Sequence, residues 1–197
     1  MSAEFPPFRP GNVLATAFTG TLSERHGEPV ERLPTPGRLL DWCAWRGLEV
    51  SSCSEDELAQ AKLLRESIHL AATAAAIGEP LPQESLVTVN ECSAGGRSAT
   101  VLTSKGELQW HLYDSAVSDA LSVIARDAIS VIAGERDGRL ALCASPTCQA
   151  AFLDTSRSRT RRWCDMNTCG NREKKARLKA KSTRVGVGRG VRGDSRG

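Results

Sequence analysis

Four of the seven cysteines fall in one short segment and form two pairs with the same internal spacing. The pairs are Cys143 with Cys148 and Cys164 with Cys169, and fifteen residues separate them. Structural Zn²⁺ takes four ligands at tetrahedral corners, and two short Cys pairs joined by a loop can supply that geometry. We therefore predict one structural zinc ion held by these four cysteines. Four thiolates leave no open coordination position, which disfavours a catalytic zinc.

Two disulfides, or four unrelated core thiols, are the alternatives to zinc. Disulfides need an oxidising compartment, and the opening residues MSAEFPPFRP lack the apolar run of a secretory signal. Seven cysteines cannot all pair within one chain. We therefore expect a cytoplasmic protein in which Cys43, Cys53 and Cys92 are buried free thiols.

Charge is divided unevenly along the 197 residues, a length that allows one ordinary domain and a small module. Residues 143–197 hold 14 Lys or Arg and 4 Asp or Glu, a net of +10, whereas residues 1–142 hold 12 and 19, a net of −7. This division favours a polyanion as the partner of the basic segment alone. No apolar run approaches the roughly 20 residues that cross a bilayer, so we expect a soluble protein without a membrane partner.

The acidic part of the chain is predicted to be mainly helical with one β-hairpin. Thr35-Pro36 supplies an N-cap and a first helical position. Ser54 and Glu57 form the capping box of a longer helix that ends before Gly78. The predicted helices are 36–46, 55–77, 82–93 and 115–133, and the predicted strands are 98–103 and 107–113.

Several features of this part are less sharply defined by pattern. Residues 12–20 suit either a helix or a strand, and Val87 and Val89 would also suit a strand. Trp42 and Trp45 are expected to anchor the core. The apolar face of the hairpin is expected to consist of Val101, Leu108, Trp110 and Leu112.

The cysteine segment is predicted to form a small treble-clef-like zinc finger. A knuckle at the first Cys pair, with Pro146 and Thr147 in a tight turn, precedes a hairpin, a basic loop and a helix opened by the second pair. Asn167 and Thr168 are expected to cap that helix, and Phe152 and Trp163 to form a small core. We divide the chain into a helical sensor or oligomerisation domain (1–139), the zinc finger with its basic helix (140–181) and a disordered basic tail (182–197).

The segment from Phe152 to Arg172 resembles the signature of the CGNR zinc-finger proteins, named for Cys169-Gly170-Asn171-Arg172. Phe-x-Asp, Ser-Arg, Arg-Arg-Trp-Cys and CGNR all occur in the family's order, with Ser158 where Asn is usual. The N-terminal part is similar to the partner domain of that family through Leu33-Pro34-Thr35-Pro36. The resemblance implies zinc binding by the four cysteines and a role as a bacterial, stress-induced transcription regulator.

The residues themselves also favour nucleic-acid binding, because guanidinium groups offer forked donors to phosphates and guanine edges. We expect DNA contacts from Arg157, Arg159, Arg161, Arg162, Arg172, Lys174, Lys175 and Arg177. Asn171 and Asp154 are expected to support the zinc site without binding the metal, Asp154 by pairing with an arginine. For Arg172, support of the zinc site is an alternative to DNA contact.

Three alternatives stay open. The protein could bind RNA or the ribosome, the basic cluster could be only a solvated face, or an enzyme site could lie in the N-terminal domain. We find no acid–base pair, nucleophile motif or phosphate loop, and so expect no enzyme. A homodimer and a small-molecule effector of the N-terminal domain are further expected partners.

Overall fold

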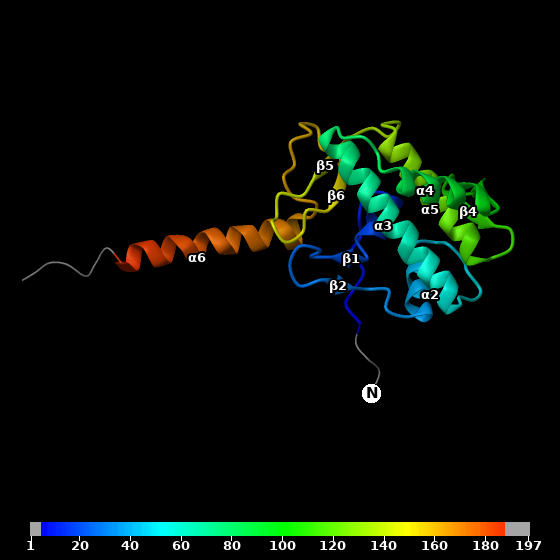
Figure 1. The fold of residues 1–197 in the computed structure, drawn as a ribbon, viewed down its shortest axis with the longest axis horizontal. Coiled ribbons are helices and arrows are strands. Elements are labelled where there is room, and N and C mark those ends of the chain that lie inside the picture. The colour runs from blue at the N-terminus through cyan, green and yellow to red at the C-terminus, as the bar shows by residue number, and fades with distance from the viewer. Residues whose placement is uncertain (1–4, 188–197) are drawn as a thin grey trace, which may run out of the picture. The chain divides into compact units, whose positions relative to one another are not determined.

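The computed structural model describes residues 5–187, and the side chains of residues 5–180 among them. The chain forms two compact units that divide between Cys164 and Asp165 (Figure 1). The helices of the first unit are α1 Leu14–Thr19, α2 Pro36–Trp45, α3 Glu55–Ile77, α4 Gln83–Gly95 and α5 Val117–Ile132. The second unit holds one π-helical turn, η1 Met166–Gly170, followed by α6 Asn171–Val187.

Three two-stranded antiparallel sheets accompany the helices of the first unit. They pair β1 Leu22–Ser23 with β2 Val30–Glu31, β3 Ser98–Leu102 with β4 Leu108–Leu112, and β5 Arg139–Leu142 with β6 Ala151–Asp154. The mainly helical fold with small hairpins is confirmed, and the segments 12–20 and 82–93 correspond to the helices α1 and α4 rather than to strands. Among the described residues, no helix is both long and apolar enough to cross a membrane.

Local capping chemistry fixes the helix starts as predicted. The Thr35 hydroxyl accepts the Arg38 N–H at 3.3 Å, with Pro36 at the first helical position. Ser54 and Glu57 form a reciprocal capping box, and Gly78 ends α3 with a left-handed φ of 75°. These contacts satisfy backbone groups that a helix end would otherwise leave without partners.

The core lies where α3, α4 and α5 pack together with α1 and α2. Trp42 is fully buried against Phe18, with 5.1 Å between ring centroids, and Leu64 and Ile124 are also fully buried. The prediction that Trp45 anchors the core was wrong, because its ring is 46% exposed and stacks on Phe8 at the surface. Only one of the two tryptophans faces inward on α2.

The β3–β4 hairpin differs most from expectation. Its register pairs Val101 with Gln109 and Thr100 with Trp110, so Val101 lies on the face opposite Trp110. Leu108 is 66% exposed and Leu112 is buried. The predicted apolar face therefore does not exist as a unit: only the part nearest the helices reaches the core.

A cluster of ionic groups joins β2 to α3. The Arg65 guanidinium is buried and donates to both carboxylate oxygens of Glu31 at 2.8 Å. Glu66 accepts from Arg65 at 2.8 Å and pairs with Arg25. Burial alone would raise the pKa of both carboxyls, but their hydrogen bonds with the arginines outweigh it and hold each pKa below its ordinary value.

Candidate metal centre and basic surfaces

The four paired cysteines come together in space. Their sulfur atoms all lie within 4.8 Å of one another, and the sulfurs of Cys148 and Cys164 are 3.7 Å apart. Four thiolates at a Zn–S distance of about 2.3 Å around a tetrahedral ion would have sulfurs about 3.8 Å apart. Within the described chain none of these cysteines forms a disulfide, and three of them are buried. The donor set and its spacing fit one zinc ion.

The first Cys pair is held in a tight knuckle between β5 and β6. The Cys143 N–H donates to the Ala150 carbonyl at 2.9 Å, and the Cys148 N–H donates to the Ser145 carbonyl at 3.1 Å. Gln149 completes the turn with a left-handed φ of 48°. The tight turn predicted at Pro146 and Thr147 is present, and the sulfurs of both cysteines belong to the four-cysteine cluster.

The second Cys pair leads into the helical part of the finger. The Asp165 carboxylate accepts the Asn167 N–H at 2.8 Å and the Thr168 hydroxyl at 3.2 Å. Asp165 is therefore the cap, and the prediction that Asn167 and Thr168 cap this helix was wrong. The Asn171 amide donates to the Asn167 carbonyl at 3.3 Å, across the π turn that carries Cys169.

Asp154 organises the loop between the two pairs. Its fully buried carboxylate accepts the main-chain N–H of Ser156 at 2.9 Å and of Arg161 at 2.7 Å. Burial would raise the pKa of this carboxyl, but hydrogen bonds from Ser156 and Arg161 outweigh it, so its pKa lies below the ordinary value. The predicted pairing of Asp154 with an arginine thus runs through a main-chain N–H.

The arginines of this loop occupy different environments. Arg161 is half-buried; its guanidinium donates to the Cys164 carbonyl at 3.0 Å and lies 5.4 Å from the centroid of the Phe152 ring. Arg161 thus stabilises the chain that leads into Cys164. The sequence does not predict this role, because Arg161 is one of several arginines in the same loop. The exposed Arg159 pairs with Asp137, and the exposed Arg162 lies 5.3 Å from the Trp163 centroid.

The predicted small core of the finger is only partly formed, since Phe152 is buried while Trp163 is half-buried. The other predicted contact residues, Arg157, Arg172, Lys174, Lys175 and Arg177, are exposed. Arg177 forms an ion pair with Glu173 one turn earlier on α6, at 3.3 Å. This helix continues to Val187, six residues into the segment predicted to be disordered; residues 188–197 of that segment lie outside the described residues.

The knuckle is fastened to the N-terminal part of the first unit through Thr147. The Thr147 hydroxyl donates to a carboxylate oxygen of Glu24 at 2.7 Å, and the Thr147 carbonyl accepts the His26 N–H at 3.1 Å. Asn12 adds a hydrogen bond to the Leu153 carbonyl on β6 at 2.7 Å. We call the Thr147–Glu24 and Thr147–His26 pair of contacts the clasp. Sequence reasoning missed it, because residues 23–33 resemble an ordinary polar loop.

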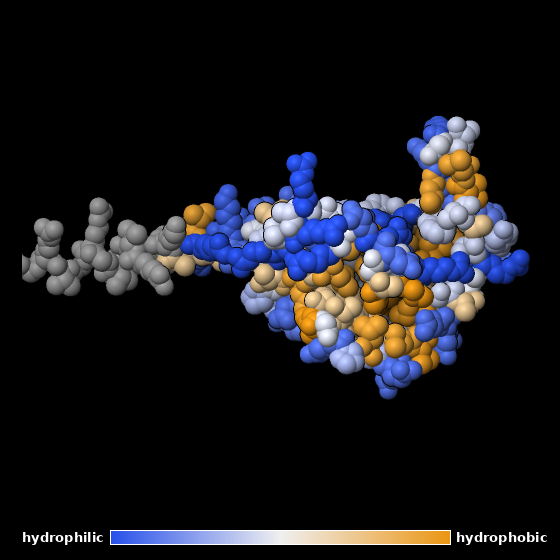
Figure 2. Space-filling model, turned by 90° about the horizontal axis from the view of Figure 1, so that it is seen from above, coloured by the Kyte–Doolittle hydropathy of each residue, from blue (hydrophilic) through white to orange (hydrophobic). Residues whose placement is uncertain are grey.

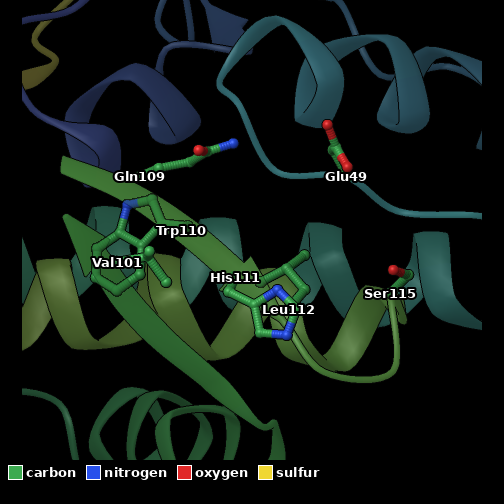
Figure 3. Close-up of a pocket in the computed structure, with 7 residues that line it drawn as sticks. All are labelled: Glu49, Val101, Gln109, Trp110, His111, Leu112 and Ser115. Atoms are coloured by element: carbon green, nitrogen blue, oxygen red, sulfur yellow. The ribbon is translucent and has the colours of Figure 1, made fainter. Parts of the chain in front are cut away.

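A small hollow lies beside the β3–β4 hairpin. Its volume is about 230 Å³, and Glu49 lies across from His111 and Leu112 of β4 (Figure 3). Ligand sites usually enclose about 300–1,000 Å³. The hollow therefore adds no support to the predicted effector, which stays a prediction.

Comparison with known families agrees with this arrangement. Residues 12–135 match the family described as "ABATE: putative stress-induced transcription regulator", and residues 139–182 match the CGNR zinc finger. No curated protein matches the sequence. The helical N-terminal domain and the four-cysteine centre fit these two matches. The chain therefore belongs to the ABATE family, and its ABATE segment is followed by a CGNR zinc finger.

Proposed function

We propose that the protein is a transcription regulator that binds DNA through arginines displayed beside a structural zinc ion. The observation that carries the proposal is an open groove of about 530 Å³ between the end of α3 and the zinc knuckle. Four arginines line it, Arg139, Arg159, Arg161 and Arg162, together with apolar side chains that include Ile77 and Leu142. Guanidinium groups suit the phosphate oxygens of a polynucleotide.

The metal would act as a scaffold in this proposal. Cys143, Cys148, Cys164 and Cys169 would hold it, and a bound Zn²⁺ would supply folding free energy to a segment too small for a large core of its own. Arg161 positions the chain leading into Cys164, whereas the exposed Arg157 and Arg162 would contact phosphates. The basic residues of α6 would add contacts from the second unit. The proposal assigns no catalytic step to the protein.

Binding to RNA is the alternative that the same charges support, since phosphates are common to both polymers. Fluorescence anisotropy with a labelled DNA duplex and a structured RNA of equal length, at several salt concentrations, distinguishes them. The proposal expects tighter binding to DNA and a linear fall of log K with log salt. Equal or tighter binding to RNA would replace DNA by RNA as the partner.

Two charge-matched variants test the surface itself. The loop variant Arg159→Ala/Arg162→Ala removes two exposed arginines that line the groove, and the control Arg97→Ala/Lys105→Ala removes two exposed charges from the β3–β4 region. We expect the loop variant to lower the salt slope by about two, close to one for each lost phosphate contact, and the control to leave it unchanged. Equal slopes for wild type and loop variant would contradict the proposed surface.

A further inference from the structure

The segment of residues 5–10 lies on the surface of the first unit and has the composition of a peptide ligand. Its sequence is Phe-Pro-Pro-Phe-Arg-Pro, and it forms neither helix nor strand. Proline fixes its own φ and favours extended backbone in the residue before it, so three prolines in six residues favour the polyproline II conformation. That conformation has no internal hydrogen bonds, which leaves its carbonyl groups free to accept them from another surface. We call residues 5–10 the strap; in Figure 1 it is the dark-blue stretch next to the grey N-terminal trace.

Two arginines hold the strap by its carbonyl groups. The Nε of Arg32 donates to the Pro7 carbonyl at 2.7 Å. The Nη2 of Arg38 donates to the Pro6 carbonyl at 3.2 Å. Arg32 is buried, and its guanidinium is held in place by a further hydrogen bond to the Ser23 hydroxyl at 2.8 Å. Donors that are already fixed lose little freedom when a ligand binds, so they are suited to recognition.

Aromatic rings make the second kind of contact with the strap. Phe8 stacks on Trp45 of α2, with 5.6 Å between ring centroids. The Arg38 guanidinium lies 4.0 Å from the centroid of the Phe8 ring and 5.1 Å from that of the Phe5 ring. Proline-rich segments dock on aromatic surfaces in this conformation, and Trp and Arg are frequent at the energetic centres of interfaces. We call Arg32, Arg38 and Trp45 the seat of the strap.

The strap fills this seat incompletely. None of residues 5–10 is fully buried, and the Trp45 ring remains 46% exposed beside Phe8. Within the described part of the chain, the buried Nε of Arg38 has no hydrogen-bond partner. A buried donor without a partner costs free energy. A ligand that covers more of Trp45 and offers an acceptor to the Nε of Arg38 would therefore bind the seat better than the strap does.

We propose that the seat is a docking site for a proline-rich segment of another protein, which displaces the strap. The strap itself indicates the chemistry of that segment: two prolines supply carbonyl groups to the arginines, and an aromatic residue after them stacks on Trp45. An exposed apolar surface, such as the hydrophobic region that Figure 2 shows, does not by itself identify a partner. The seat does, because a segment of defined composition already occupies it.

A second copy of the chain is the less favoured occupant. It offers only the same strap, which competes at a disadvantage with the strap that is already tethered beside the seat. A different segment gains an advantage by satisfying the Nε of Arg38 and covering the exposed part of Trp45. The inference makes no use of nucleic-acid binding and stands independently of the proposed function.

A peptide added in trans tests the site. A labelled peptide with the sequence of residues 5–10 is titrated with the full-length, zinc-loaded protein without nucleic acid, and fluorescence anisotropy reports binding. A tethered segment competes at about millimolar effective concentration, so for a peptide Kd of about 0.1 mM the strap weakens the apparent affinity about tenfold. Phe8→Ala removes the ring that anchors the strap, and this variant should bind the peptide about tenfold more tightly than the wild type.

The controls separate the seat from the rest of the surface. Adding Trp45→Ala to Phe8→Ala should abolish the gain in affinity. Adding Tyr113→Ala instead should preserve it, because Tyr113 is an exposed aromatic residue outside the seat. Circular dichroism should show unchanged helicity in each variant. If Phe8→Ala loses helicity, Pro6→Gly/Pro7→Gly replaces it with the same expectation, because glycine loosens the strap without removing a ring.

Three outcomes would overturn the inference. The first is a variant with a loosened strap that binds the peptide no more tightly than the wild type. The second is an equal effect of Trp45→Ala and Tyr113→Ala, or equal binding of a peptide whose three prolines are replaced by alanine. The third is a wild-type dimer in sedimentation velocity that Phe8→Ala converts to a monomer, which would make a second copy the occupant.

Discussion

Replacement of Thr147 by valine tests whether the clasp stabilises the zinc knuckle. Valine keeps the branched shape and nearly the volume of threonine, so the change removes the hydroxyl without opening a cavity. The carboxylate of Glu24 then loses the donor that now stands 2.7 Å from it. Glu24 is only 8% exposed, and water cannot fully replace the missing hydroxyl.

The magnitude follows from the kind of hydrogen bond that is lost. A hydrogen bond to a charged group contributes about 1.5–3 kcal/mol to the free energy of unfolding. Arg9 remains 3.4 Å from the other carboxylate oxygen and still balances part of its charge. We therefore expect Thr147→Val to lower the free energy of unfolding by about 2 kcal/mol. For a chain of this size, that loss corresponds to about 4–8 °C in Tm.

Urea unfolding at a fixed excess of zinc measures this difference, because bound metal shifts the apparent stability. Thr147→Ser keeps the hydroxyl and should cost less than half as much. A double-mutant cycle with Glu24→Gln should give a coupling energy of about 1 kcal/mol or more. The reasoning fails if Thr147→Val unfolds within about 0.5 kcal/mol of the wild type, or if the two substitutions are additive.

Two further predictions concern groups inside the fold. Burial, reinforced by the nearby Arg25, lowers the pKa of His69 from 6.5 to about 4, although Glu66 acts in the opposite direction. The folded state therefore favours neutral His69. The resulting stability is complete above pH 6.5 and is lost as the pH falls toward 4. Between pH 7.5 and 5 the free energy of unfolding of the wild type should fall by about 2 kcal/mol more than that of His69→Gln. Parallel urea-unfolding curves for the two proteins across that range would contradict this account. Cys148→Ser should retain less than one zinc per chain after dialysis against a weak chelator. Its circular dichroism should still show the signal of the helices α2 to α5. Stoichiometric metal in this variant would exclude Cys148 from the ligand set.

The features that the sequence predicts well depend on short-range chemistry. A capping hydroxyl, a proline at the first helical turn and a glycine after the last one act within four residues, so α2 and α3 begin and end as predicted. The cysteine spacing works in the same way, because the two pairs are each closed by a local turn. Their meeting then needs only a loop of sufficient length.

The features that sequence reasoning missed depend on which surfaces meet. Glu24 and Thr147 are 123 positions apart, and neither residue is unusual in its own segment. Arg161 stands among similar arginines, yet its half-buried guanidinium turns toward the carbonyl groups near Cys164. The hairpin was misjudged for a related reason: alternation predicts two faces, but only packing decides how far along the strands a core extends.

The clasp also bears on how the matched ABATE segment and the zinc finger influence each other. The family boundaries fall between residues 135 and 139, yet the knuckle shares one compact unit with the helices before it. Contacts such as Thr147 to Glu24 and Leu153 to Asn12 form only when both parts are folded. Coupling through these contacts is reciprocal: the free energy by which an event at the Glu24 loop favours metal binding at the knuckle equals that by which metal binding favours the event. An event in the helical part therefore has a physical route to the arginines beside the metal centre through this contact.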